Sequence, residues 1–245
     1  MNGKNEPCRL CQSVGEELRF SHVLPEFLYK PLRDEKHRYI GLEVTQQKGA
    51  NRILLQKGIR EYLLCGDCEQ RLAKYERYAA EVLRKLPGTS RKPPGTVVHV
   101  TGLNYTKFKL FQLSLLWRAG VSRQASFQEV NLGPHEERLR GMVLEGDPGK
   151  PTDYGCILMR TQGPETLNHI LQLPGHLRFS EHHAYDMILF GMIWIYIVSS
   201  HSGQIQEKDY FLSEAGVLSI LVTRTTSTEF IAGLAERARR MGVVL

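Results

Sequence analysis

The chain has 245 residues, of which 42% are hydrophobic and 24% charged, and this ordinary globular composition excludes wholesale disorder. Five cysteines are too few for a disulfide scaffold at this length. The formal net charge of +6 is unevenly placed: residues 1–96 hold 18 basic and 12 acidic side chains, whereas residues 97–245 hold 14 of each. Four of the five cysteines also lie before residue 97, which favours a small, basic, cysteine-bearing module joined to a neutral partner.

The amino-terminal part predicts short extended segments followed by one long helix. We expect extended chain at residues 19–24 and in two runs within 52–64, where Lys57-Gly58 favours a hairpin turn. From residue 69 to 86, apolar side chains recur every three or four positions and predict an amphipathic helix. They are Leu72, Tyr75, Ala79, Val82 and Leu86.

A linker is predicted at residues 87–96. This segment holds three prolines and two glycines, so it neither continues a helix nor forms a central strand. It also falls where the charge balance changes. We therefore expect one module at 1–86 and a second at 97–245.

The second module predicts a mixed α+β fold with a central sheet. Residues 105–120 are apolar nearly all round, which indicates a buried helix. Pro134 marks the first turn of another helix, and Thr226 and Glu229 have capping-box spacing before a last one. The expected elements are strands at 97–100, 154–160, 186–199 and 218–224 and helices at 105–120, 134–144 and 227–241.

No membrane segment is expected. The longest apolar run, residues 187–198, is shorter than the roughly 20 residues that a spanning helix needs. Its β-branched and aromatic residues favour a buried strand. The amino end has no apolar run after Lys4 and so lacks the pattern of a secretory signal. These features predict a soluble, cytoplasmic protein.

Three features of the second module are interpreted as structural. Trp117 and Trp194 lie in the densest apolar segments and are expected in the core, and Cys156 is expected to be a core thiol. His182 and His183 are adjacent, so on a strand they point to opposite faces, which disfavours a shared metal ion.

Two Cys-x-x-Cys units, Cys8 with Cys11 and Cys65 with Cys68, carry the strongest signal. Each turn aims two sulfurs at one point, and two such turns complete a tetrahedral zinc shell. The alternatives are redox dithiols or unrelated core cysteines, but a thioredoxin-like site needs only one such unit. Zinc would also supply folding free energy to a small, polar module. Extended chain between the units and a helix after the second is the order of a treble clef.

At this point the sequence resembles the zinc-containing HNH endonucleases, over roughly residues 8–85. The first match is Ser21-His22-Val23-Leu24-Pro25, a strand ending in His before an apolar-apolar-Pro segment. The second is Leu63-Leu64 followed directly by Cys65. The family's Asn before the second cysteine unit is missing, since Arg60 and Glu61 stand there and Asn51 is further back.

The resemblance implies a general base at His22 and a divalent ion on the scissile phosphate, Mg²⁺ or Mn²⁺. Glu69 and Glu76 are candidate ligands in place of the missing imidazole, because they lie within about 20° of each other around the helix axis. A neutral imidazole is a suitable base. The structural alternatives are a hydrogen-bonded His22, a helix-start carboxylate at Glu69 and a surface ion pair at Glu76.

The expected partner is nucleic acid, with DNA implied by the resemblance. Basic residues of the first module would contact phosphates, or else form a solvated loop; they are Lys30, Arg33, Lys36, His37, Arg38, Lys48, Arg52 and Lys57. The second hypothesis is a decayed, non-cleaving module that binds nucleic acid or protein. Residues 97–245 carry no readable motif and could position substrate, sense a signal, or bind a partner or a second copy. The family implies bacterial genome defence or mobile-element biology.

Overall fold

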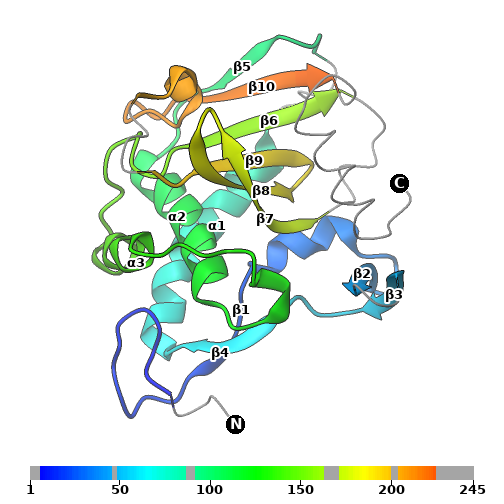
Figure 1. Cartoon of the computed structure of the whole chain (residues 1–245), viewed down its shortest axis with the longest axis vertical. Coiled ribbons are helices and arrows are strands. Elements are labelled where there is room, and N and C mark those ends of the chain that lie inside the picture. The colour runs from blue at the N-terminus through cyan, green and yellow to red at the C-terminus, as the bar shows by residue number, and fades with distance from the viewer. Residues whose placement is uncertain (1–5, 46–48, 87–91, 163–170, 200–203, 225–245) are drawn as a thin grey trace.

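The computed structural model describes residues 6–45, 49–86, 92–162, 171–199 and 204–224 (Figure 1). Its architecture is mixed α+β with a central six-stranded sheet, as the sequence predicted. In the described part of the chain, no helix is long and apolar enough to cross a membrane. The predicted helix at 227–241 lies outside the described residues.

Two small antiparallel sheets and one long helix make up the amino-terminal part. β1 (Arg19–His22) pairs with β4 (Arg60–Leu64), and β2 (Tyr39–Thr45) pairs with β3 (Gly49–Leu55). Between them lies a 3-10 helix, η2 (Glu26–Leu32).

The hairpin expected within 52–64 is wrong. The two runs are strands, but each pairs with an earlier segment of the chain. Lys57-Gly58 connects two sheets: the Tyr39 hydroxyl donates to the Lys57 carbonyl at 2.9 Å, and Gly58 lies against the Tyr29 ring. A side chain at position 58 would collide with that ring, which explains the glycine without a hairpin turn.

The long helix α1 (Gly66–Lys85) begins at Gly66, three residues before the predicted start, with Cys65 as its N-cap. Asp67 and Glu69 lie in its first turn and Arg84 and Lys85 in its last, so both ends complement the helix dipole. The predicted apolar stripe is on its buried face, where Leu72 and Ala79 are almost fully covered.

The carboxyl-terminal part is built on the six-stranded sheet, in the order β5-β10-β6-β9-β8-β7. Only β10 and β6 run parallel, and every other neighbouring pair is antiparallel. Its strands are β5 (Val97–Val100), β6 (Cys156–Gln162), β7 (Gln172–Phe179), β8 (His182–Leu189), β9 (Met192–Ile197) and β10 (Leu218–Arg224). The helices expected here are α2 (Tyr105–Val121) and α3 (His135–Glu145), and two short 3-10 helices are η4 (Ala125–Phe127) and η7 (Gln206–Tyr210).

The single strand expected at 186–199 is wrong: the run is a hairpin of β8 and β9. Phe190 and Gly191 form its two-residue turn with φ angles of 54° and 71°. Both central residues of such a turn need positive φ, which matches the twist of the flanking strands. β9 and most of β8 are buried on both faces, so both strands are apolar throughout. The composition of the segment therefore stays the same across the turn and could not reveal its position.

Helix α2 lies at the centre of the molecule, where it packs against α1, α3 and the sheet (Figure 1). The Trp194 ring of β9 stacks on Phe108 of α2, with 6.2 Å between ring centroids, and meets Phe111 edge-on at 6.3 Å. Phe27 of η2 contacts Phe111 at 5.9 Å. One hydrophobic cluster therefore runs from Cys8 to Ile220 through both parts of the chain. The division at 87–96 stays a prediction.

Candidate metal centre and its surroundings

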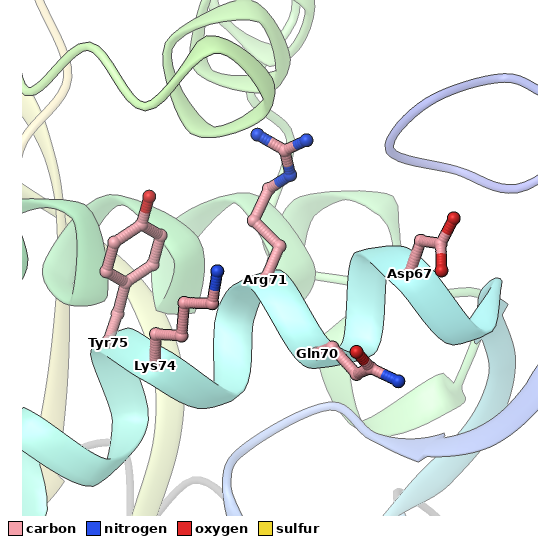
Figure 2. Close-up of a pocket in the computed structure, with 5 residues that line it drawn as sticks. All are labelled: Asp67, Gln70, Arg71, Lys74 and Tyr75. Atoms are coloured by element: carbon pink, nitrogen blue, oxygen red, sulfur yellow. The ribbon is translucent and has the colours of Figure 1, made fainter.

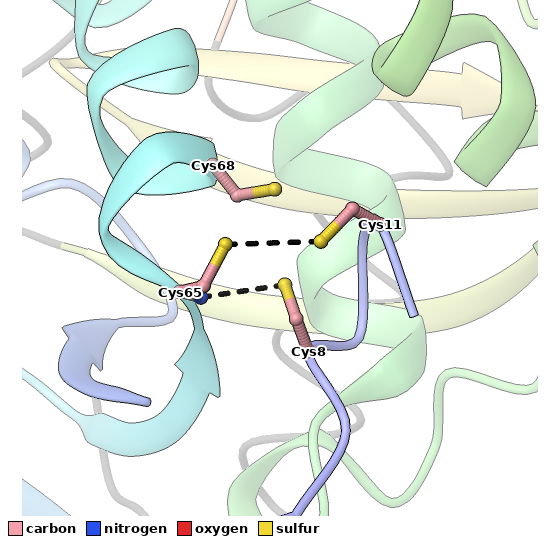
Figure 3. Close-up of side chains that lie close together, drawn as sticks. All are labelled: Cys8, Cys11, Cys65 and Cys68. Atoms are coloured by element: carbon pink, nitrogen blue, oxygen red, sulfur yellow. Dashed lines mark hydrogen bonds between the residues drawn. The ribbon is translucent and has the colours of Figure 1, made fainter. Parts of the chain in front are cut away.

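The four cysteines of the first module converge on one point, as the sequence predicted. The sulfurs of Cys8, Cys11, Cys65 and Cys68 all lie within 4.8 Å of one another (Figure 3). Cys11 Sγ and Cys65 Sγ are 3.7 Å apart. Two thiolates on one tetrahedral zinc ion, each about 2.3 Å from it, are separated by about 3.8 Å. The site therefore has the size of a zinc shell.

Backbone hydrogen bonds fix the first cysteine turn. The Gln12 amide donates to the Cys8 carbonyl at 2.8 Å, and Gln12 has a φ of 60°, which reverses the chain after Cys11. The Arg9 amide donates to the Leu63 carbonyl of β4 at 3.0 Å. This last bond holds the turn beside the second cysteine unit, which is distant in sequence.

The second unit is placed by the start of α1. Cys65 is the residue before the helix, and Cys68 lies in its first turn. The Cys65 amide donates to the Cys8 sulfur at 3.3 Å (Figure 3). Amide donors stabilise negative charge on sulfur and favour the thiolate that zinc requires.

The pKa shifts of these thiols differ from one cysteine to the next. A hydrogen bond with Cys68 lowers the pKa of Cys8 to about 4, and the same contact raises the pKa of the Cys68 thiol. Burial raises the pKa of Cys65. Four thiolates packed this closely repel one another, so their common ionisation needs a positive ion between them. The donor set, four sulfurs that are buried except for half-buried Cys11, suits zinc.

His22 ends β1 on the same face of the β1–β4 sheet as Arg60, its direct cross-strand partner. The Arg60 guanidinium donates from Nε to His22 Nε2 at 3.1 Å, which assigns the imidazole proton to Nδ1. Burial and then the charge of Arg60 hold the pKa of His22 below its ordinary value, with Glu26 and Glu76 opposing them. His22 is therefore neutral at pH 7.

Glu76 lies close enough to His22 to act on its charge, but it is already paired. Its Oε1 is 2.8 Å from the Arg118 guanidinium of α2, and the Arg118 side chain is only 3% exposed. The same Arg118 nitrogen donates to the His22 carbonyl at 3.2 Å. The surface ion pair considered from sequence is thus a pair with a buried arginine of the second module.

Glu69 lies half-buried in the first turn of α1, directly after Cys68. In the described part of the chain, only the four cysteines form a group of three or more metal-ligating side chains with converging ligand atoms. His22, Glu69 and Glu76 form no such group. The acidic stripe expected beside His22 is therefore not assembled as a metal site.

The sequence reasoning missed Arg118 and assigned no contact to Arg60. Arg60 was named only as a residue standing where the HNH endonucleases, which the sequence resembles, have an asparagine. Arg118 carries a weaker signal, a single charge near the end of an otherwise apolar helical segment. Its partner is 42 residues away along the chain, so no local pattern identifies it.

Of the eight residues predicted to contact phosphates, four are solvent-exposed and two form ion pairs with carboxylates. Arg33 pairs with Glu26 at 3.1 Å, and Arg38 pairs with Asp34 at 2.8 Å. Lys48 and the Arg52 side chain lie outside the described residues. The exposed ones are Lys30, Lys36, His37 and Lys57.

An open pocket of about 390 Å³ lies along α1 (Figure 2). It is lined by polar residues and contains none of the predicted catalytic ones. Arg71 already donates to the Leu144 carbonyl at the end of α3, at 2.7 Å. We therefore place the candidate site at the four cysteines and at the face of the β1–β4 sheet that carries His22 and Arg60, called the His22 face below. The residues that line the α1 pocket are Asp67, Gln70, Arg71, Lys74 and Tyr75.

Comparisons with known proteins add no relative: no family model matches the chain, and neither a curated protein nor a solved structure is significantly similar to it.

Proposed function

We propose that the amino-terminal part is a zinc-stabilised treble-clef module of HNH type that binds DNA and cleaves its phosphodiester bonds. The observation that carries the proposal is His22, a neutral imidazole held by Arg60 at the end of the first strand. Nε2 is the basic nitrogen of this tautomer, so His22 can take a proton from an attacking water once Arg60 releases that nitrogen. The resemblance of residues 8–85 supports the role, and zinc at the four cysteines would hold β1, β4 and α1 around it.

The face that carries His22 also carries an aromatic pair, of which Phe20 is exposed and Tyr62 half-buried. Phe20 and Tyr62 are opposite each other on β1 and β4, with 5.1 Å between ring centroids, and Phe20 is 54% exposed. Alternation along the strands places them on the same side as His22 and Arg60. An exposed ring beside a cation suits an unstacked base and its phosphate, which supports nucleic acid as the partner.

The catalytic divalent ion stays a prediction of the resemblance. Mg²⁺ or Mn²⁺ at Glu69 and Glu76 would require Glu76 to exchange Arg118 for the ion. Leaving Arg118 buried without its partner is costly. No step of the reaction is therefore assigned to that ion.

This buried ion pair favours the second candidate function, a module that binds nucleic acid without cleaving it. The two candidates share the zinc centre and the exposed face, and they differ only in what His22 does. Binding and cleavage must therefore be measured on the same variants.

The deciding experiment incubates plasmid DNA with the full chain and Mg²⁺ or Mn²⁺. We expect the wild type to nick or linearise the plasmid, and His22→Ala to lose at least about a hundredfold in rate, the contribution of a general base. His99→Ala, an exposed histidine on β5, is the matched control and should cleave normally.

DNA affinity is measured in parallel by fluorescence anisotropy at fixed salt. Equal inactivity of wild type and His22→Ala, with affinity retained, would establish the binding module in place of the nuclease. Phe20→Ala should weaken binding to single-stranded DNA severalfold in either case. Absence of DNA binding by the zinc-loaded wild type would reject both candidates.

A further inference from the structure

Two histidines at the edge of the large sheet lie within contact distance of each other. His176 is on β7, the last strand of the sheet, and His183 is on β8 beside it. His176 Nε2 and His183 Nδ1 are 3.1 Å apart, and the ring centroids are 5.4 Å apart. Both side chains are exposed, so an ion could reach these nitrogens from solvent.

The strand register explains why they meet. His176 is opposite Tyr185, and Arg178 is opposite His183, so the two histidines are diagonal neighbours on one face. The Tyr185 ring packs edge-on against His176, at 5.6 Å between centroids. Tyr185 is itself fixed, since its hydroxyl donates to the Asn131 carbonyl at 2.7 Å and accepts from the Asn131 amide at 3.0 Å.

We propose that His176 and His183 form a second metal site, which takes a divalent transition-metal ion of the kind that imidazole prefers, Zn²⁺, Ni²⁺ or Cu²⁺. Two imidazole nitrogens that share one ion, each about 2.0–2.1 Å from it, are separated by roughly 3 Å. The observed 3.1 Å already has this spacing. Waters complete the coordination, because the pair faces solvent.

One cationic side chain shares the face with the pair. The Arg178 guanidinium is held by the Glu181 carbonyl at 3.1 Å and keeps its charge. Burial, then the charge of Arg138 and after it that of His183, lower the pKa of His135 at the start of α3, so a third imidazole is near the pair. The sequence pattern disfavoured a metal at His182-His183, and adjacent residues do point to opposite faces. In the proposal, His183 shares the ion with His176 of β7 and not with its sequence neighbour His182.

The test titrates Ni²⁺ into the full chain with its cysteine centre already loaded with zinc, and follows binding by calorimetry. We expect one additional site per chain in the wild type. His176→Ala and His183→Ala should each weaken it by at least about tenfold, since even loss of an outer partner of a metal ligand costs that much. Both residues are exposed, so neither substitution removes core packing.

His182→Ala is the matched control, because this residue is next in sequence but lies on the opposite face. It should bind Ni²⁺ as the wild type does. Cu²⁺ provides a second measurement, since its electron paramagnetic resonance signal should carry couplings to two imidazole nitrogens and lose one in either variant. A wild type with no additional site, or a site unchanged by His183→Ala, would overturn the proposal and leave the pair as a plain hydrogen bond.

Discussion

At the scale of single residues, the four cysteines have the largest consequence for the whole chain. They belong to two turns separated by 53 residues, and their sulfurs converge. A metal ion that is absent from the unfolded chain contributes its binding free energy to folding. Each cysteine should therefore matter far more to stability than its own packing does.

Cys65→Ser should abolish zinc binding and lower the free energy of unfolding by several kcal/mol. Metal analysis gives the zinc content per chain, and urea denaturation gives the stability. Cys156→Ala is the control: Cys156 is 1% exposed in the second module, so its loss costs packing but should leave about one zinc per chain. Full zinc content in folded Cys65→Ser would rule out the four-cysteine site.

The ionisation of His22 is a second prediction at this scale. Its pKa should be below the ordinary value of about 6.5, because burial and Arg60 disfavour the charged ring. Arg60→Ala should raise this pKa, and Glu76→Gln should lower it further. Because the folded-state pKa is depressed, the associated stability is fully present above about pH 6.5 and is lost as the pH falls through the folded-state value.

Nuclear magnetic resonance of the histidine side chains measures this directly in the full chain. Arg178→Ala, a distant arginine on β7, should leave the His22 titration unchanged. A His22 pKa above 6.5 in the wild type would contradict the neutral base on which the nuclease proposal depends.

At the scale of elements, the sequence predicted helices better than strand pairing. The 3.6-residue pattern located α1, the apolar run at 105–120 located α2 and Pro134 located α3, each to within a few residues, because these signals are local. The pairing of β4 with β1 instead of β3 depends on residues about 40 positions away, and no local spacing encodes it. The same distinction applies to the candidate site. The two cysteine units could be predicted because each is a local motif, whereas the contacts of His22 with Arg60 and Arg118 join residues far apart in the sequence.

Helix α2 shows how apolar composition conceals specific polar contacts. Its two buried cationic side chains are Lys109 and Arg118. The sequence predicted a buried helix here but no contact for either of them. Lys109 donates to the Tyr154 carbonyl at 3.1 Å, and burial lowers the pKa of its ammonium group to about 8. Arg118 joins α2 to α1 through Glu76 and to β1 through the His22 carbonyl. The two Arg118 contacts join the second module to the His22 face.

Glu76→Ala should destabilise the protein by about 3–5 kcal/mol, because it leaves the buried Arg118 charge without a partner. Replacing both residues, as Glu76→Ala with Arg118→Met, should recover much of this loss. Glu69→Ala is the control on the same helix and should change stability by less than about 1 kcal/mol. Chemical denaturation of these chains and of the single variant Arg118→Met measures the coupling, and additive effects would show that the pair is not a unit.

At the scale of the whole molecule, the two predicted modules share one core. The hydrophobic cluster is continuous from Cys8 to Ile220. Polar bonds cross between the parts as well: Arg140 of α3 donates to the Leu10 carbonyl at 2.6 Å, and the Ser122 hydroxyl donates to Glu61 at 2.8 Å. The change in composition at residues 87–96 therefore marks a difference in charge and cysteine content between the two parts. The hydrophobic packing is shared by both parts.

Shared packing predicts that both parts unfold in one cooperative transition. Calorimetry should show a single peak, and the loss of Trp194 burial, followed by fluorescence, should coincide with the release of zinc, followed by a chromogenic chelator. Phe111→Ala removes the ring that contacts both Phe27 and Trp194 and should lower stability by about 3–5 kcal/mol while shifting both signals together. Zinc release well before the fluorescence change would instead show that residues 1–86 unfold as a separate domain.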